Sequence, residues 1–124
     1  MIDFQNKKVF KLSKGKEKSI PKEVFDLLVT GEEVAGYYSS MRDFVIFTNK
    51  RIIACNVQGI TGPKKDYTSL PYSKMQAFSV ETSGTFDMDS ELTVCFSGLG
   101  TMKFDFSSNS DVQSINRLIA SHVL

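Results

Sequence analysis

Residues 43–57, with the sequence DFVIFTNKRIIACNV, decide the fold of this chain. Two runs rich in β-branched and aromatic residues, 44–47 and 52–55, flank the polar stretch 48–51. Because Asn49 tolerates the left-handed backbone of a tight turn, the pattern predicts an antiparallel hairpin. Neither run alternates between apolar and polar residues, which indicates that other elements cover both of its faces. The hairpin is therefore expected at the centre of a β-rich domain.

Further strands are predicted on both sides of this hairpin. Pro71 lies in one of them and places it at the edge of a sheet, since proline cannot donate to a neighbouring strand. The last three strands alternate cleanly and predict a sheet with one solvent-exposed face. The seven predicted strands lie at 34–40, 44–47, 52–55, 67–72, 78–82, 91–97 and 102–107.

A helix is predicted near each end of the chain. Residues 21–29 carry an apolar stripe, with Ser19 as the cap and Gly31 as the left-handed stop. The second helix begins at a capping box formed by Ser110 and Gln113, and apolar residues follow it at helical spacing. Two roughly orthogonal sheets of three or four strands each would leave an open end, which the C-terminal helix can cover.

Length and composition favour one domain without metals or disulfides. A chain of 124 residues can bury enough surface for a core of its own. The formal net charge is +1, so nucleic acid is not an expected partner. No stretch is apolar enough for a membrane span or a signal peptide. We therefore expect a cytoplasmic protein in which Cys55 and Cys95 are reduced core residues, although two cysteines could also pair.

Charge is distributed unevenly along the chain. Residues 7–22 carry seven lysines and one acid, whereas residues 81–111 carry six acids and one lysine. These regions are either two solvated surfaces or complementary surfaces that attract each other, within one chain or between copies. For the second interpretation, the candidate oligomer contacts are Glu81, Asp87, Asp89 and Glu91.

The chain resembles the bacterial pleckstrin-homology-like (PH-like) family. The residues that carry the resemblance are the strings 47–53 (FTNKRII), 58–62 (QGITG) with Lys64 and Lys65, 71–72 (PY) and 78–87 (FSVETSGTFD). The resemblance covers nearly all of residues 32–124, and residues 1–31 would be an N-terminal helical extension of the same structural domain. The resemblance implies a mostly β (α+β) PH-like fold, a seven-stranded antiparallel two-sheet barrel or sandwich capped by the C-terminal helix. It also implies a tendency to form ring-like homo-oligomers, and it supplies no settled biochemical function.

Phosphoinositide binding does not follow from this resemblance. Lipid-binding PH domains usually place several bases in a long loop between their first two strands, whereas the loop here is only residues 41–43. Other bases could still meet an anionic surface, at about 1 kcal/mol each. The candidate anion- or lipid-binding residues are Arg42, Lys50, Arg51, Lys64 and Lys65.

Neither catalysis nor metal binding has a candidate constellation. Residues 59–65 lack the spacing of a phosphate loop, and residues 87–98 lack the sixth-position glycine and final glutamate of a calcium loop. His122 is the only histidine, so no His-metal cluster or His-based triad can form within the chain. We therefore expect no catalytic residues, no bound metal and no cofactor.

Three functions remain open at this point. The first is a non-catalytic scaffold that self-associates through strand edges and charged surfaces. The second is a peripheral membrane adaptor that binds anionic headgroups. The third is recognition of a protein partner as a peptide in a groove beside the final helix, near Leu118 and Ile119. An enzyme is the least supported alternative.

Overall fold

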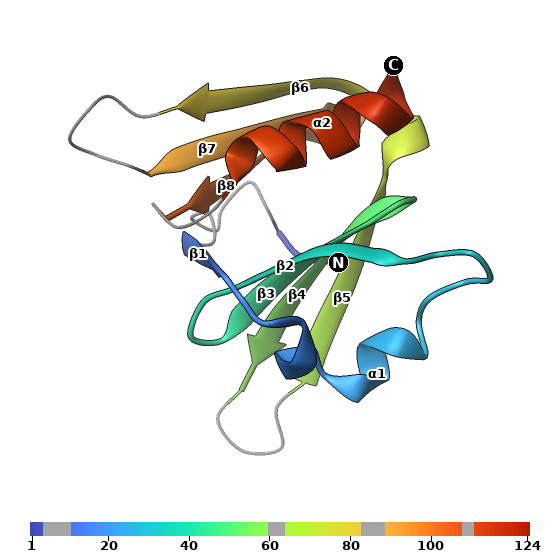
Figure 1. Ribbon diagram of the computed structural model, residues 1–124, viewed down its shortest axis with the longest axis vertical. Helices are drawn as coiled ribbons and strands as arrows, with labels where there is room; N and C mark the ends of the chain where they lie inside the picture. Colours follow the sequence, from blue (N-terminus) through green and yellow to red (C-terminus); the bar gives the residue numbers. More distant parts are fainter. Residues whose placement is uncertain (4–10, 60–63, 83–88, 108–110) are drawn as a thin grey trace.

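The structure is a computed structural model that describes residues 1–3, 11–59, 64–82, 89–107 and 111–124 (Figure 1). Within these residues, eight strands form one open sheet in the order β5-β4-β3-β2-β1-β8-β7-β6. Strands β2 to β5 form one half and β6 to β8 the other, and the two halves run at a large angle to each other. The elements are β1 (Lys11–Lys14), α1 (Lys22–Phe25), β2 (Val34–Ser39), β3 (Asp43–Thr48), β4 (Arg51–Gln58), β5 (Lys64–Pro71), β6 (Met75–Thr82), β7 (Ser90–Phe96), β8 (Gly100–Phe106) and α2 (Val112–Val123), with short 3-10 turns at Glu17–Ser19 and Tyr72–Lys74.

The predicted central hairpin is confirmed as β3 and β4, but its turn forms differently. No non-glycine residue in the described chain has a positive φ, so Asn49 does not adopt the left-handed conformation. The Thr48 hydroxyl instead accepts hydrogen bonds from the backbone N–H groups of Lys50 and Arg51, both at 3.0 Å. Hydrogen bonds to the Thr48 hydroxyl thus stabilise the turn, whereas the sequence suggested a left-handed backbone at Asn49.

Both faces of the hairpin are buried, as the unbroken apolar runs predict. Val45 and Phe47 point into the main core between the two halves of the sheet. Phe44 and Ile46 point the other way, into a second cluster that includes Val24 of α1. Helix α1 of the N-terminal extension therefore packs on the outer face of the β2–β5 half of the sheet.

Strand β1 is the eighth strand, and it was not predicted from the sequence. Lys11 pairs in parallel with Asp105 of β8, and Ser13 pairs with Ser39 of β2, so β1 joins the two halves. Only Leu12 of this strand is buried. A four-residue strand with a single buried side chain shows no period, and the predicted helical extension over residues 1–31 is wrong for residues 11–14.

The two helices follow the prediction with corrections at their ends. The predicted helix at 21–29 is limited to Lys22–Phe25. No side chain caps this helix, so the proposed Ser19 cap is wrong. Gly31 has the predicted left-handed conformation, with a φ of 82°. Helix α2 is capped by Asp111, whose carboxylate accepts from Ser114 N–H, one position later than the predicted box. Ser110, the predicted cap, lies outside the described residues.

The β6–β8 half has one buried and one solvent-exposed face, as predicted. Buried residues alternate along β7 and β8 and contribute Leu92, Val94 and Phe104 to the main core. Helix α2 lies across this half and adds Ile115 and Ile119 (Figure 1). The sheet does not close into a complete barrel, because β5 and β6 remain as its two edges.

Candidate functional site

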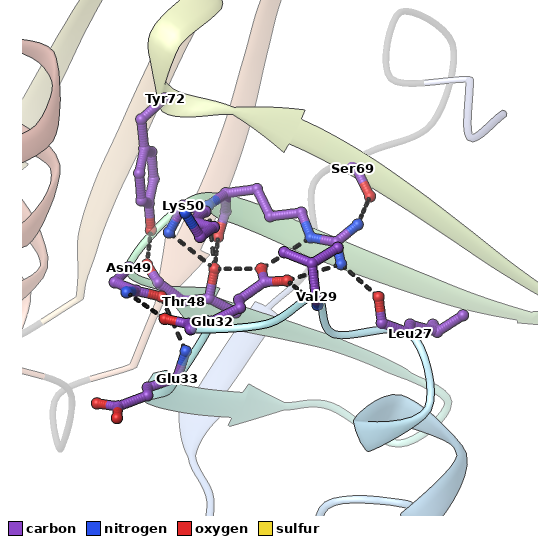
Figure 2. A network of polar contacts seen from close by, with 11 residues as sticks. Leu27, Val29, Glu32, Glu33, Thr48, Asn49, Lys50, Ser69 and Tyr72 are labelled. Carbon is purple, nitrogen blue, oxygen red and sulfur yellow. Dashed lines mark hydrogen bonds and ion pairs between the residues drawn. The ribbon is translucent and has the colours of Figure 1, made fainter.

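A buried carboxylate organises the end of the β3–β4 hairpin (Figure 2). The Glu32 side chain is fully buried and pairs with Arg51, whose Nε and Nη2 donate to the two carboxylate oxygens, both at 2.9 Å. The Thr48 hydroxyl donates to Glu32 Oε2 at 2.7 Å, and the Val29 N–H donates to Oε1 at 3.1 Å. The loop between α1 and β2 is thereby fixed to the hairpin turn.

The electrostatics of Glu32 follow from these contacts. Burial alone would raise the pKa of its carboxyl, because it penalises the charged form. Hydrogen bonds from Arg51, Thr48 and Val29 outweigh burial and lower the pKa to about 2. Glu32 is therefore a permanently charged structural anchor at neutral pH, and it is not suited to act as a general acid or base.

Arg51 is held by the protein and has little capacity for a ligand. Besides Glu32, its guanidinium donates to the Leu27 carbonyl at 2.7 Å and to Ser69 Oγ at 2.8 Å. From the sequence we expected Arg51 to be a free base, and neither Glu32 nor Thr48 was placed in any site. Nothing in the sequence marks Glu32 as the partner of Arg51, since the two residues lie on different elements.

A groove of about 480 Å³ lies beside this network. Its apolar lining comes from Val29, Pro71 and the ring of Tyr72, and the Tyr72 hydroxyl donates to the Thr48 carbonyl at 2.7 Å. The His122 ring from the end of α2 lies 5.3 Å from the Tyr72 ring, measured between centroids. The remaining lining residues are Glu32, Asn49, Lys50, Arg51 and Ser73. The groove thus combines apolar lining residues with the exposed charge of Lys50.

The five predicted anion-binding bases do not form one patch. Lys50 and Arg51 lie at the turn end of the hairpin, whereas Arg42, Lys64 and Lys65 lie at its other end. The length of β4, about 23 Å at 3.3 Å per residue, separates the two groups by more than a Debye length.

Partners within the protein also engage the bases at the second end. Arg42 donates to the Gly59 carbonyl, and Lys65 pairs with Glu23, which lowers the pKa of that carboxyl. Lys64 is exposed.

The predicted acidic contacts fall into a row across the exposed face of β6–β8. Glu81 pairs in register with Glu91, and Glu91 pairs with Asp105 of β8. Lys11 of β1 continues the row beside Asp105. We call Glu81, Glu91 and Asp105 the acid row. Asp89 is exposed just before β7, and Asp87 lies outside the described residues.

Burial and the neighbouring carboxyls of the acid row act together on Glu91. Burial, the adjacent Asp105 carboxyl and the charge of Glu81 together raise the pKa of Glu91, although Lys103 opposes them. Like charges placed directly opposite each other destabilise a sheet. The acid row therefore favours a positively charged partner surface.

The side chains with potential chemical reactivity are placed as core residues or left isolated. Cys55 is a buried core residue, as expected, and burial raises the pKa of its thiol to about 11. Cys95 is only half-buried and belongs to neither core cluster, so the expectation that it is a core residue is wrong; both are free thiols. The described residues contain no group of three or more His, Cys, Asp or Glu residues that could hold a metal ion. His122 Nδ1 lies 2.9 Å from the Leu118 carbonyl in its own helix.

The profile of the family described as "Bacterial PH domain" matches residues 3–123. This chain belongs to the bacterial PH domain family. The chain is 37% identical to the uncharacterized protein YjqA of Bacillus subtilis over 105 residues, which cover 83% of this chain and 84% of that protein.

Solved bacterial structures show the same fold. A DUF1696 family protein with a pleckstrin-homology domain from Shewanella loihica superposes with a TM-score of 0.80 at 35% identity, covering 93% of this chain and 99% of that one. A pleckstrin homology domain from Shewanella amazonensis gives a TM-score of 0.64 at 40% identity, covering 82% and 83%. The predicted PH-like fold is thus confirmed, with eight strands in place of seven among the described residues.

None of the helices in the described parts of the chain is long and apolar enough to cross a membrane.

Proposed function

We propose that this bacterial PH domain is a non-catalytic, cytoplasmic scaffold that self-assembles into a ring-like homo-oligomer. The acid row carries the proposal, because it concentrates negative charge on an exposed sheet face. A lysine-rich segment is available as its complement, with exposed Lys14, Lys16, Lys18 and Lys22. Among the described residues, no ion pair joins these lysines to the acid row.

The placement of these two surfaces supports the proposed ring. The acid row and the lysine-rich segment are different patches of one chain, so contact between copies is head-to-tail. Head-to-tail contacts generate a closed ring when the rotation between neighbours closes. The sheet edges at β5 and β6 add main-chain groups that can contribute to such contacts.

Sedimentation velocity at low and high salt tests this proposal. We expect the wild-type protein to sediment as a discrete oligomer that weakens with salt, since exposed charges are screened. The double variant Glu81→Lys, Glu91→Lys should sediment as smaller species. Glu33→Lys is the matched control, because Glu33 is exposed and lies outside both surfaces, and it should assemble like the wild type. A wild-type monomer at high concentration would contradict the proposal.

Peripheral binding to an anionic membrane is the alternative function, and the exposed Lys64 at the same end of the β3–β4 hairpin as Arg42 favours it. The separation of the bases into two groups predicts weak binding, because only two or three charges can face a bilayer together. Pelleting with phosphatidylserine vesicles at low salt, lost in Lys64→Glu, would support this function. Equal pelleting with neutral vesicles would argue against it.

A further inference from the structure

The groove beside the Glu32–Arg51 network has the size of a small-molecule site. Its volume of about 480 Å³ lies within the range of about 300–1,000 Å³ that is typical of ligand sites. It forms where the β3–β4 hairpin turn, the 3-10 turn at Tyr72–Lys74 and the end of α2 meet. Neither self-assembly through the acid row nor the bases at the other end of the hairpin make use of this groove.

The walls of the groove are fixed by hydrogen bonds within the protein. The Tyr72 N–H donates to the Lys50 carbonyl at 3.2 Å. The Tyr72 hydroxyl donates to the Thr48 carbonyl at 2.7 Å (Figure 2). Glu32 and Arg51, which also line the groove, hold each other at 2.9 Å. A ligand therefore meets preorganised walls and does not have to order them, which favours binding.

The balance of charge in the groove favours an anion. Glu32 and Arg51 form an ion pair, so their charges offset each other. Lys50 is the other lysine or arginine in the lining, and it is exposed. Within the described chain, no salt bridge engages its ammonium group. The groove thus carries a positive charge that a carboxylate can neutralise.

The end of α2 gives the groove an aromatic surface. The exposed His122 ring lies 5.3 Å from the Tyr72 ring between centroids, with an interplanar angle of 39°. Its Nδ1 lies 2.9 Å from the Leu118 carbonyl, which holds the ring in place. Aromatic rings attract one another beyond the effect of the area they bury. The negative dipole end of α2 also lies here, so an anion is disfavoured beside His122 and favoured beside Lys50.

We propose that this groove binds a small aromatic carboxylic acid, with its carboxylate at Lys50 and its ring system against His122 and Pro71. The apolar lining residues Val29 and Pro71 favour burial of the rings. Most of the lining residues are exposed, so the ligand exchanges with solvent. For an acid with two fused rings, we expect a dissociation constant of about 1 mM or tighter. Such a ligand is lost on purification.

Indole-3-propionate and its neutral amide, indole-3-propionamide, test the groove on the full-length protein. The chain contains no tryptophan, so indole fluorescence excited beyond the absorption of tyrosine reports the ligand. Its anisotropy rises on binding to the protein or to a larger assembly, and titration with protein gives each dissociation constant. We expect the acid to bind about three-fold more tightly than the amide, because the amide cannot form the exposed charge pair with Lys50.

Three variants place the ligand in the groove. Lys50→Gln should abolish the preference for the acid over the amide. Lys74→Gln is the matched control and should keep the preference, since Lys74 is exposed on the same 3-10 turn as Tyr72 but does not line the groove. His122→Ala should weaken the binding of both ligands by about three-fold, because the aromatic contact is lost.

Four results would overturn the proposal. The first is an anisotropy that does not rise at millimolar protein, and the second is equal affinity of the wild type for acid and amide. The third is a loss of preference in Lys74→Gln equal to that in Lys50→Gln, which would indicate general attraction to a basic surface. The fourth is unchanged binding of both ligands by His122→Ala, which would place the rings elsewhere.

Discussion

Glu32→Gln is the substitution that most directly tests the role of the buried carboxylate. Glutamine is nearly isosteric, but it removes the charge that pairs with Arg51 and accepts from Thr48 and Val29. Breaking one member of a buried pair leaves an uncompensated charge, which costs about 3–5 kcal/mol when both groups are fully buried. The Arg51 side chain is 21% exposed, so water offsets part of this loss and we expect about 2–3 kcal/mol.

The pH dependence of stability gives an independent magnitude. Folding lowers the pKa of Glu32 from its ordinary 4.5 to about 2. A depressed pKa contributes stability above the unfolded value, here about 3 kcal/mol, which is lost as pH falls from 4.5 through 2. Glu32→Gln lacks this carboxyl, so its free energy of unfolding should fall less steeply over the same pH range.

Urea denaturation at a fixed protein concentration measures both quantities, because self-association would otherwise shift apparent stability. The matched control is Glu33→Gln, whose exposed side chain points away from the network (Figure 2). It should change the free energy of unfolding by less than about 0.5 kcal/mol. The account of Glu32 would be refuted if Glu32→Gln matched this control at pH 7, or if it kept the full acid sensitivity of the wild type.

Three further predictions concern the surrounding structure. Tyr72→Phe removes the buried hydroxyl that donates to the Thr48 carbonyl and should lower the free energy of unfolding by about 1–2 kcal/mol in the same urea assay. Asp111→Ala removes the cap of α2 and should cost about 1 kcal/mol, read from the thermal unfolding midpoint. At pH 8, a thiol reagent should label Cys95 first, because burial raises the pKa of Cys55 to about 11; equal labelling rates in the folded protein would contradict that placement.

Local patterns predicted the parts of the fold that depend on neighbouring residues. The runs around residues 44–47 and 52–55 identified a hairpin covered on both faces, since their lack of alternation is itself a burial signal. Strand β1 escaped prediction because both of its partners, the antiparallel strand β2 and the parallel strand β8, lie far from it in the sequence. A four-residue segment with one buried leucine has no local sequence pattern that would indicate such pairing.

The candidate site was predictable only in part. Glu81 and Glu91 were recognised as surface acids, but only strand register shows that Asp105 continues them into a row. Arg51 looked like a free base, because its pairing with Glu32 depends on how the α1–β2 loop reaches the hairpin turn. Charge type can be read from sequence, whereas charge pairing depends on tertiary placement.

Native mass spectrometry at physiological ionic strength is the measurement that tests the central claim most directly. It reports the number of subunits in the assembly and any small molecule retained with it. We predict one closed oligomer, without retained ligand, that dissociates in the Glu81→Lys, Glu91→Lys variant and persists in Glu33→Lys. A monomer that carries phospholipid would contradict self-assembly and would favour the membrane adaptor.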